Sequence, residues 1–163
     1  MTDVAKNISV ALLRISLGWI FLWAFLDKMF GLGFATPAER AWLNGGSPTA
    51  GFLSNSPKGP LAQVFNGLAG QGWVDWLFMI GLLCLGVSLI LGAGIKIAAT
   101  AGTILLLLMW LAVLPPSNNP VIDDHIVYAL ALIVLRHLRA GRYYGLGTWW
   151  SSQPLVQKNR WLE

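Results

Sequence analysis

The sequence predicts an all-α integral membrane protein, a four-transmembrane-helix bundle with a long extracytoplasmic loop that contains short interfacial helices. Composition is the first reason: 56% of the 163 residues are hydrophobic, against 11 Lys plus Arg and 7 Asp plus Glu, and the mean hydropathy is +0.63. The second reason is pattern, because the apolar residues form long blocks separated by Gly, Pro and Asn clusters, without strand-like alternation. A water-soluble domain needs a more charged surface.

Three apolar blocks are long enough to cross a bilayer, whose hydrocarbon core of about 30 Å needs about 20 helical residues. They occupy residues 8–28, 74–95 and 97–114. The first block is too long for the apolar region of a signal peptide and no small-residue cleavage site follows it, so we expect it to be retained. Lys96 marks a tight turn between the second and third blocks, and a Pro-Pro pair ends the third.

The fourth block has only ten uncharged residues, but its start is signalled upstream. Asn119 as an N-cap and Pro120 as the first helical residue extend the predicted helix to residues 120–138. Asp123 and Asp124 then fall near the helix start, where the helix dipole favours negative charge. The extended helix is long enough to span.

The distribution of basic residues predicts the orientation. If four spans alternate, the positive-inside rule makes the richer side cytoplasmic, with both termini on it. Arg14 lies about 9 Å into the first span, and its long side chain can reach the same side. The cytoplasmic set is Lys6, Lys96, Arg136, Arg139, Arg142, Lys158 and Arg160, against Lys28, Arg40 and Lys58 outside.

Two segments lie outside the spans. The outer loop of residues 31–72 is far longer than ordinary connections, and such loops are usually functional or disordered. A capping box at residues 36–39 and an amphipathic spacing over residues 61–68 favour short helices on the membrane surface. Residues 141–163 mix basic and aromatic side chains, as suits a cytoplasmic tail in the headgroup layer. Residues 1–140 form the transmembrane domain.

Several chemistries are excluded. The single cysteine, Cys84, cannot form an internal disulfide or a redox-active pair. His125 and His137 lie about 18 Å apart on one helix, too far to ligate one haem. No haem, flavin, iron–sulfur or metal-binding motif is visible, so we expect none of these groups within the chain, and we expect no nucleic-acid partner.

Three separated motifs carry a family resemblance: WAFLDKMFGLGFATP at residues 23–37, WLNGGSPTAGFL at 42–53 and NPVIDDHIVYALAL at 119–132. In order and spacing they resemble the DoxX/DoxD family of small bacterial and archaeal membrane proteins. The DoxD branch includes the membrane subunit of thiosulfate:quinone oxidoreductase. The resemblance implies a prokaryotic plasma membrane, quinone as the electron acceptor and a second, extracytoplasmic oxidoreductase subunit as partner. A homodimer stays open.

The densest ionisable cluster consists of Asp123, Asp124 and His125, with Tyr128 one helical turn further. One interpretation is helix-start electrostatics at the water interface. The other is catalytic, because ionisable groups at membrane depth tend to mark substrate or proton paths. His125 with Asp124 has suitable proton-transfer chemistry for a quinone reaction. Tyr128 could hydrogen-bond a quinone carbonyl.

Asp27 and Lys28 end the first span, either as interfacial charges or as part of a site. In the functional reading Lys28 binds an anion at the outer mouth, and Arg40 and Lys58 attract it. Asp27 then holds Lys28 or Arg40, or accepts a proton. Arg14 is either a snorkelling residue or the partner of a buried carboxylate or lipid headgroup.

Tryptophans could wall a quinone pocket, and we assign Trp23 and Trp76 to it, although such residues also form interfacial belts. Cys84 lies on a line of small residues with Gly81, Ser88 and Gly92, which predicts helix packing.

The leading hypothesis is therefore the membrane subunit of a quinone-linked oxidoreductase that oxidises thiosulfate outside the cytoplasm. A non-catalytic membrane anchor that recruits a redox or detoxifying protein is the alternative. A small transporter is a third, disfavoured because no carboxylate lies in the central part of any predicted span.

Overall fold

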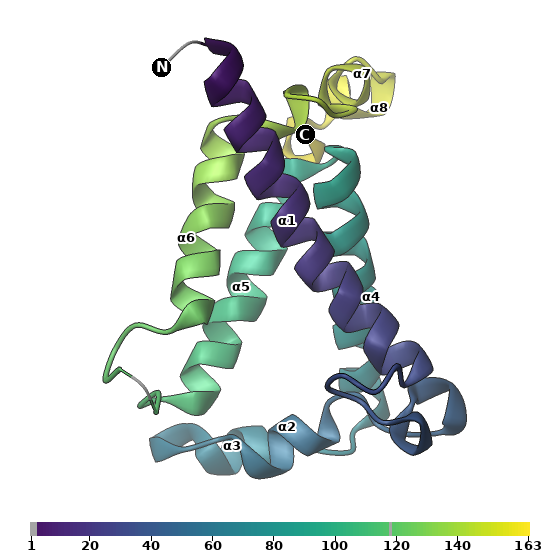
Figure 1. Ribbon diagram of the computed structural model, residues 1–163, viewed down its shortest axis with the longest axis vertical. Helices are drawn as coiled ribbons and strands as arrows, with labels where there is room; N and C mark the ends of the chain where they lie inside the picture. Colours follow the sequence, from purple (N-terminus) through teal and green to yellow (C-terminus); the bar gives the residue numbers. More distant parts are fainter. Residues whose placement is uncertain (1–2, 118) are drawn as a thin grey trace.

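The computed structural model describes residues 3–117 and 119–163, and within them the chain is all-α. Three of the described helices are long and apolar enough to cross a membrane: α1 (Asp3–Phe30), α4 (Gly72–Leu91) and α5 (Ile95–Val113). A shorter helix, α6 (Asp124–His137), runs beside α5 (Figure 1). The chain is a multi-pass membrane protein.

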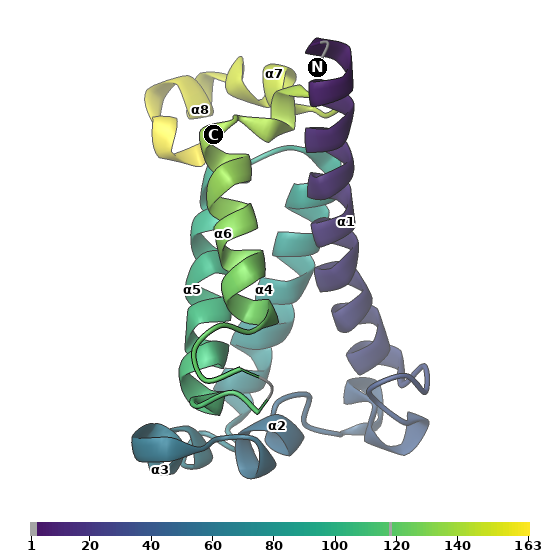
Figure 2. The same ribbon diagram turned by 60° about the vertical axis from the view of Figure 1, so that its left-hand side comes forward.

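The two ends of the bundle differ in composition. The start of α1 and the C-terminal tail lie at one end, and the segment between α1 and α4 lies at the other, in both ribbon views (Figures 1 and 2). We call these the basic end and the loop end. Eight of the 11 Lys and Arg residues belong to the basic end, whereas five of the 7 acidic residues belong to the loop end: Asp27, Glu39, Asp75, Asp123 and Asp124.

Glycine allows α1 and α4 to approach closely. A Cβ atom on Gly86 of α4 would lie 2.7 Å from the backbone nitrogen of Leu22 in α1, and one on Gly18 would lie 2.9 Å from the backbone nitrogen of Ile90. These two glycines therefore let the backbones of α1 and α4 lie in direct contact over about one helical turn.

The packing line predicted through Gly81 and Cys84 is wrong. A Cβ atom on Gly81 would meet nothing within 4 Å, and Cys84 is exposed on the bundle surface. Small residues occur on more than one face of α4, and the sequence does not say which face meets α1. The buried stripe of this helix is Asp75, Met79, Leu82, Leu85, Gly86 and Leu89.

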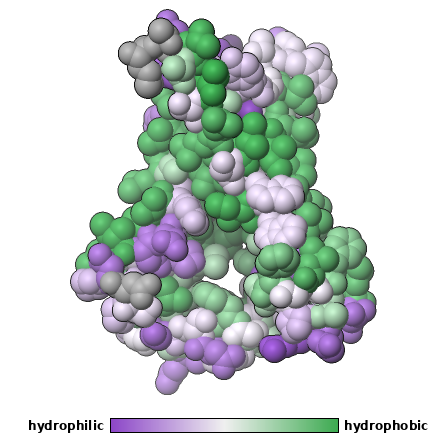
Figure 3. Space-filling model, viewed as in Figure 1, coloured by the Kyte–Doolittle hydropathy of each residue, from purple (hydrophilic) through white to green (hydrophobic). Residues whose placement is uncertain are grey.

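Apolar side chains fill the bundle and also cover its outside. The core includes Leu17, Phe21, Met79, Leu106 and Leu132. The middle of the molecule is largely hydrophobic on the face shown in Figure 3, and polar residues gather toward the loop end, where the surface is hollowed. An outer surface of this kind suits lipid contact.

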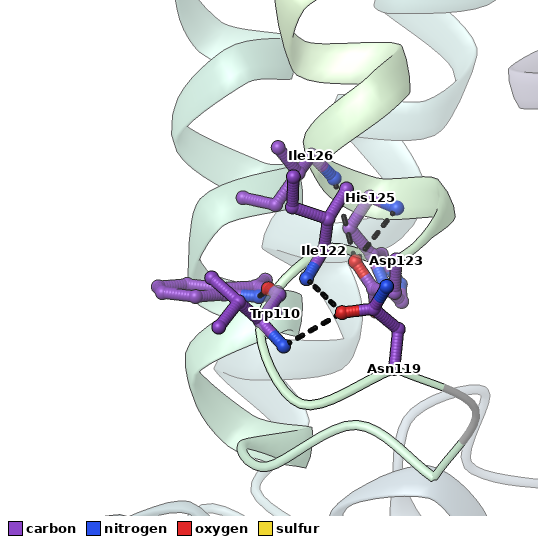
Figure 4. A network of polar contacts seen from close by, with 7 residues as sticks. Trp110, Asn119, Ile122, Asp123, His125 and Ile126 are labelled. Atoms are coloured by element: carbon purple, nitrogen blue, oxygen red, sulfur yellow. Dashed lines mark hydrogen bonds and ion pairs between the residues drawn. The ribbon is translucent and has the colours of Figure 1, made fainter.

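Helix α6 begins four residues later than the predicted start at Pro120. Asp123 is its N-cap, and the Asp123 carboxylate accepts hydrogen bonds from the backbone N–H groups of His125 at 3.1 Å and Ile126 at 3.4 Å. The Asn119 side chain accepts from the N–H groups of Val121 and Ile122 instead (Figure 4). Asn119 closes a turn on its own backbone, a conformation that competes with helix capping.

The loop end is built from short helices, as predicted. They are η1 (Ala38–Arg40), η2 (Trp42–Asn44), α2 (Ala50–Asn55), η3 (Gly59–Leu61) and α3 (Ala62–Asn66), and α2 and α3 lie across the end of the bundle (Figures 1 and 2). The predicted capping box is not formed, because Pro37 is the N-cap of η1 and no side chain caps it. Lys58 donates its backbone N–H to the Ala112 carbonyl at 2.8 Å and ties the loop to α5.

The tail folds over the basic end. It comprises η4 (Ala140–Arg142), α7 (Gly147–Ser151), α8 (Pro154–Lys158) and η5 (Arg160–Leu162). The Leu146 N–H donates to the Leu91 carbonyl at 2.8 Å, and the Trp150 indole N–H donates to the Leu162 carbonyl at 2.7 Å. The tail is therefore attached to the end of α4.

Candidate functional site

A pocket of about 330 Å³ lies beside the loop-end half of α1, and we call it the aromatic pocket. Its volume falls in the range of small-molecule sites. The lining residues come from three successive turns of α1 and from the segment that follows it: Trp19, Ile20, Trp23, Ala24, Asp27, Lys28, Phe34 and Ala35.

Three rings give the aromatic pocket its flat walls. Trp19 and Trp23 are one turn apart on α1, with ring centroids 5.7 Å apart and planes tilted by 35°. The edge of one ring meets the face of the other between Trp23 and Phe34, at 5.0 Å and 84°. Such arrangements are favourable for aromatic quadrupoles, so the rings support one another.

Asp27 fixes the segment that carries Phe34. Its side chain is only 2% exposed, and the carboxylate accepts hydrogen bonds from the Phe34 N–H at 3.2 Å and the Ala35 N–H at 3.0 Å. The Gly31 N–H donates to the Asp27 main-chain carbonyl at 2.8 Å, with Gly31 at φ +64°. Asp27 thus lies in the last turn of α1 and holds Phe34 against Trp23.

Lys28 is the cation of the aromatic pocket. Its side chain is half-buried. It forms no hydrogen bond or ion pair with any described residue, and none with its neighbour Asp27. Three N–H donors therefore remain for a ligand. Arg40 and Lys58, which were predicted to act with Lys28, are exposed on the loop end and do not line the pocket.

At the start of α6, His125 is paired with Asp123 and not with Asp124. The His125 Nδ1 lies 2.7 Å from the Asp123 carboxylate, the one contact of ion-pair length between side chains of opposite type within residues 3–117 and 119–163. Asp123 has extended backbone angles (φ −130°, ψ −171°) that turn its side chain back over the first turn. Asp124, already helical, is exposed and its carboxylate contacts no described donor.

The same contacts lower the pKa of the Asp123 carboxyl group. Burial raises the pKa of its carboxyl, but the His125 ring and the backbone N–H groups of Ile126 and His125 favour the ionised form more strongly, so the pKa stays below its ordinary value. Because Nδ1 of His125 is held by the carboxylate, Nε2 is the ring nitrogen left for proton exchange.

Two other predicted site residues lie elsewhere. Tyr128 packs against the hydrophobic core one turn into α6. Trp76 forms a T-shaped pair with Trp42 of η2, with centroids 4.6 Å apart, and is not part of the aromatic pocket. Trp19, one turn from Trp23 on the same helix, lines the pocket in its place.

Arg14 has a different environment from both predicted ones. Its side chain is 0% exposed, and it donates to the carbonyls of Leu89, Ile90, Tyr143 and Tyr144. Its partners are main-chain oxygens and not a carboxylate or a lipid headgroup. Arg14 therefore joins α1 to the end of α4 and to the tail.

Two residues of the loop end were missed. Phe34 lies in the first family-like motif, which was the signal for it. Asp75 of α4 is 6% exposed, and one of its oxygens accepts from the Ser47 hydroxyl at 2.9 Å and from the Thr49 N–H and hydroxyl at 3.1 and 2.6 Å. A lone carboxylate at the start of an apolar span was the available signal for this anchor of the loop.

Comparison of the chain with protein-family models, curated proteins and solved structures finds no match. Within the described residues, no group of three or more His, Cys, Asp or Glu side chains is arranged to hold a metal ion.

Proposed function

We propose that the chain is the membrane subunit of a quinone-linked oxidoreductase and that the aromatic pocket binds the quinone ring. The observation that supports this most is that Lys28, which forms no hydrogen bond or ion pair with a described residue, lines the same pocket as Trp19, Trp23 and Phe34. A quinone is a flat, largely apolar ring with carbonyl acceptors, so its chemistry fits aromatic walls with one donor. When bound, it supplies an acceptor for two electrons and two protons.

Each pocket residue then has a role. Lys28 would hold the quinone by donating a hydrogen bond to one of its carbonyl oxygens, and its positive charge would favour reduction there. Trp19 and Trp23 would supply an aromatic surface for the quinone ring, and Phe34, packed edge-to-face on Trp23, would close one side of it. Asp27 acts as a positioning residue, because its two carboxylate oxygens already accept hydrogen bonds from the backbone N–H groups of Phe34 and Ala35.

We assign proton exchange to the His125–Asp123 pair at the same end of the bundle. The carboxylate holds Nδ1 at 2.7 Å and stabilises the imidazolium, so Nε2 can accept and release a proton. Asp124 is exposed beside the pair and can pass protons to water, and Tyr128 stands one turn inward.

Thiosulfate is the proposed electron donor, on the basis of the DoxX/DoxD resemblance. Arg40 and Lys58 are exposed at the loop end, where they can attract a dianion. The electrons come through a second subunit that docks on the loop end. The loop end is then extracytoplasmic and the basic end cytoplasmic, with α6 as the fourth span; its 14 residues measure about 21 Å.

Photoaffinity labelling tests the quinone pocket directly. Purified protein in lipid nanodiscs is irradiated with an azidoquinone, digested, and mapped by mass spectrometry. We expect labels within residues 19–35, lost with an excess of unmodified quinone and reduced in Lys28→Met and Trp23→Leu variants. Trp73→Leu is the matched control, because Trp73 is an exposed tryptophan outside the pocket. Labelling outside residues 19–35, unchanged in both variants, would refute the pocket.

Activity is tested separately, by anaerobic reduction of a soluble quinone with thiosulfate, with and without membrane extract. Reduction that is lost in Lys28→Met and in His125→Ala supports the enzyme. The alternative is a non-catalytic anchor, which the exposed apolar Leu43 and Val64 of the loop end favour as a docking surface. Co-purification of a soluble partner without quinone labelling or reduction would support the anchor.

A further inference from the structure

A second pocket, of about 300 Å³, lies at the basic end, where the tail folds over the turn between α4 and α5. We call it the basic pocket. Four Lys and Arg side chains and one histidine line it, together with a single acidic residue: Lys96, Arg136, Arg139, Arg142, His137 and Glu163. It takes no part in the proposed quinone chemistry, which belongs to the loop end.

We propose that the basic pocket binds a phosphate group, that of an anionic phospholipid in the adjacent membrane leaflet. The charges come from three separate parts of the chain, since Lys96 is in α5, Arg136 is in α6, and Arg142 is in η4. Gathering like charges around one hollow is unfavourable unless an anion neutralises them. Glu163 supplies only part of that charge.

The donors in this pocket are largely unused. Arg139 and Arg142 make no side-chain hydrogen bond or ion pair with any described residue. Lys96 uses one N–H, to the Arg160 carbonyl at 2.9 Å, and Arg136 uses one, to the Thr100 hydroxyl at 3.0 Å. Guanidinium groups have five N–H donors in a fork that matches phosphate oxygens, so a phosphate would find several partners at once.

Backbone packing fixes the shape of the pocket. A Cβ atom on Gly141 would lie 2.2 Å from the Gly92 carbonyl oxygen, and one on Gly147 would lie 2.4 Å from the Gly141 carbonyl carbon. The tail therefore lies directly on the turn, with no side chain between. Arg139 has φ +50°, a left-handed conformation that ends α6 and turns the chain into η4. The backbone that carries Arg139 and Arg142 is therefore fixed against the turn between α4 and α5.

The surroundings favour a lipid over a dissolved anion. Around the pocket, α7 and α8 lie across the basic end (Figures 1 and 2), with Leu146, Trp149, Leu155 and Trp161 exposed. Aromatic and apolar side chains at this position suit the headgroup boundary, where acyl chains would lie beside them. Basic pockets at the ends of membrane helices bind anionic headgroups in this way.

Native mass spectrometry of the purified protein with added lipid tests the proposal. We expect retention of phosphatidylglycerol but not of phosphatidylcholine, and about tenfold weaker retention by Arg139→Gln, Arg142→Gln. The control is Lys6→Gln, Lys158→Gln, which removes the same charge outside the pocket and is expected to retain the lipid. Arg139→Lys, Arg142→Lys keeps the charge and is expected to give intermediate retention. Such a graded result would show that the Gln variant loses lipid because it loses phosphate contacts and not because it misfolds.

Inorganic phosphate is the second arm of the experiment. Millimolar phosphate is expected to leave phosphatidylglycerol bound. Displacement of the lipid by phosphate would mean a site for a free anion, and equal loss of lipid in the pocket and control variants would mean that overall charge alone attracts it. Either result would overturn the lipid site, while leaving the quinone pocket untouched.

Discussion

The Arg14 guanidinium of α1 donates a hydrogen bond at 2.9 Å to the main-chain carbonyl of Ile90, in the last turn of α4. The last four carbonyls of a helix lack intrahelical donors. Here the Ser88 carbonyl accepts from the Gly92 N–H, the Leu91 carbonyl accepts from the Leu146 N–H, and Arg14 satisfies Leu89 and Ile90. A cation also complements the negative end of the α4 dipole.

Replacement of Arg14 by Met is expected to destabilise the protein by at least about 3 kcal/mol, because several buried carbonyls lose a charged donor. The same change should release the tail, since Arg14 also holds the carbonyls of Tyr143 and Tyr144. Thermal unfolding in nanodiscs measures the first effect, and trypsin cleavage after Arg142 measures the second.

Lys6→Met is the control for that experiment, because Lys6 is an exposed cation of the same helix. We expect little change in its unfolding temperature or in tail cleavage. Arg14→Lys should fall between the two variants, because an ammonium lacks the guanidinium fork. A tail equally resistant to trypsin in Arg14→Met would contradict the role given to Arg14.

A second prediction compares two glycines of α4. Gly86→Ala is expected to destabilise the protein by about 1–3 kcal/mol, because the added methyl group would overlap the backbone of α1 at Leu22. Gly81→Ala adds the same methyl group in open space, and alanine is the better helix former, so no loss of stability is expected. Unfolding midpoints of the two variants, measured in one lipid, check the prediction; equal midpoints would be the contrary result.

Hydrophobic length was enough to predict the all-α fold and its three long spans. The physical reason is that a bilayer demands about 20 apolar residues whatever the tertiary contacts are. The face by which α4 meets α1 could not be predicted, because Gly81 and Gly86 look alike in a sequence and differ only in what lies opposite them. The start of α6 was missed because Asn119 has two uses, capping a helix or closing a turn.

The candidate site was predicted in part. Trp23, Asp27 and Lys28 do line one pocket, since they share the last turns of one helix. Phe34 lines the pocket because the loop after α1 folds back onto that helix, and an irregular loop has no periodic sequence pattern from which this could be predicted. The partners of Arg14 could not be predicted, because they are backbone carbonyls, and every residue carries such a group, so no sequence pattern marks them.

The positioning role of Asp27 is the third prediction. Asp27→Ala removes the acceptor for the Phe34 and Ala35 N–H groups, so both amides should exchange hydrogen faster, by about tenfold or more if about 1.4 kcal/mol is lost. Asp27→Asn keeps one acceptor oxygen and should show a smaller increase. Hydrogen exchange followed by mass spectrometry of the segment after α1 measures this, and unchanged exchange in Asp27→Ala would show that the carboxylate does not hold the segment.

The fourth prediction concerns pH and the cap of α6. The folded-state pKa of Asp123 lies below its ordinary value of 3.8, so its ionised form stabilises the fold. This contribution is fully present above the ordinary pKa and is lost as the pH falls through the lowered folded pKa. Asp123→Ala is expected to cost about 1 kcal/mol at neutral pH, as for other N-caps, and the unfolding midpoint should fall by about 2–4 °C.

Asp123→Asn separates the cap from the charge. Asparagine still accepts the backbone N–H groups of His125 and Ile126 but does not titrate, so its unfolding midpoint should depend less on pH in the acid range than that of the wild type. Asp124→Ala is the control, because the Asp124 carboxylate is exposed and makes no side-chain contact with a described donor; only a smaller loss from the helix dipole is expected. If Asp124→Ala and Asp123→Ala lost stability equally, the Asp123 carboxylate would not be what holds the start of α6.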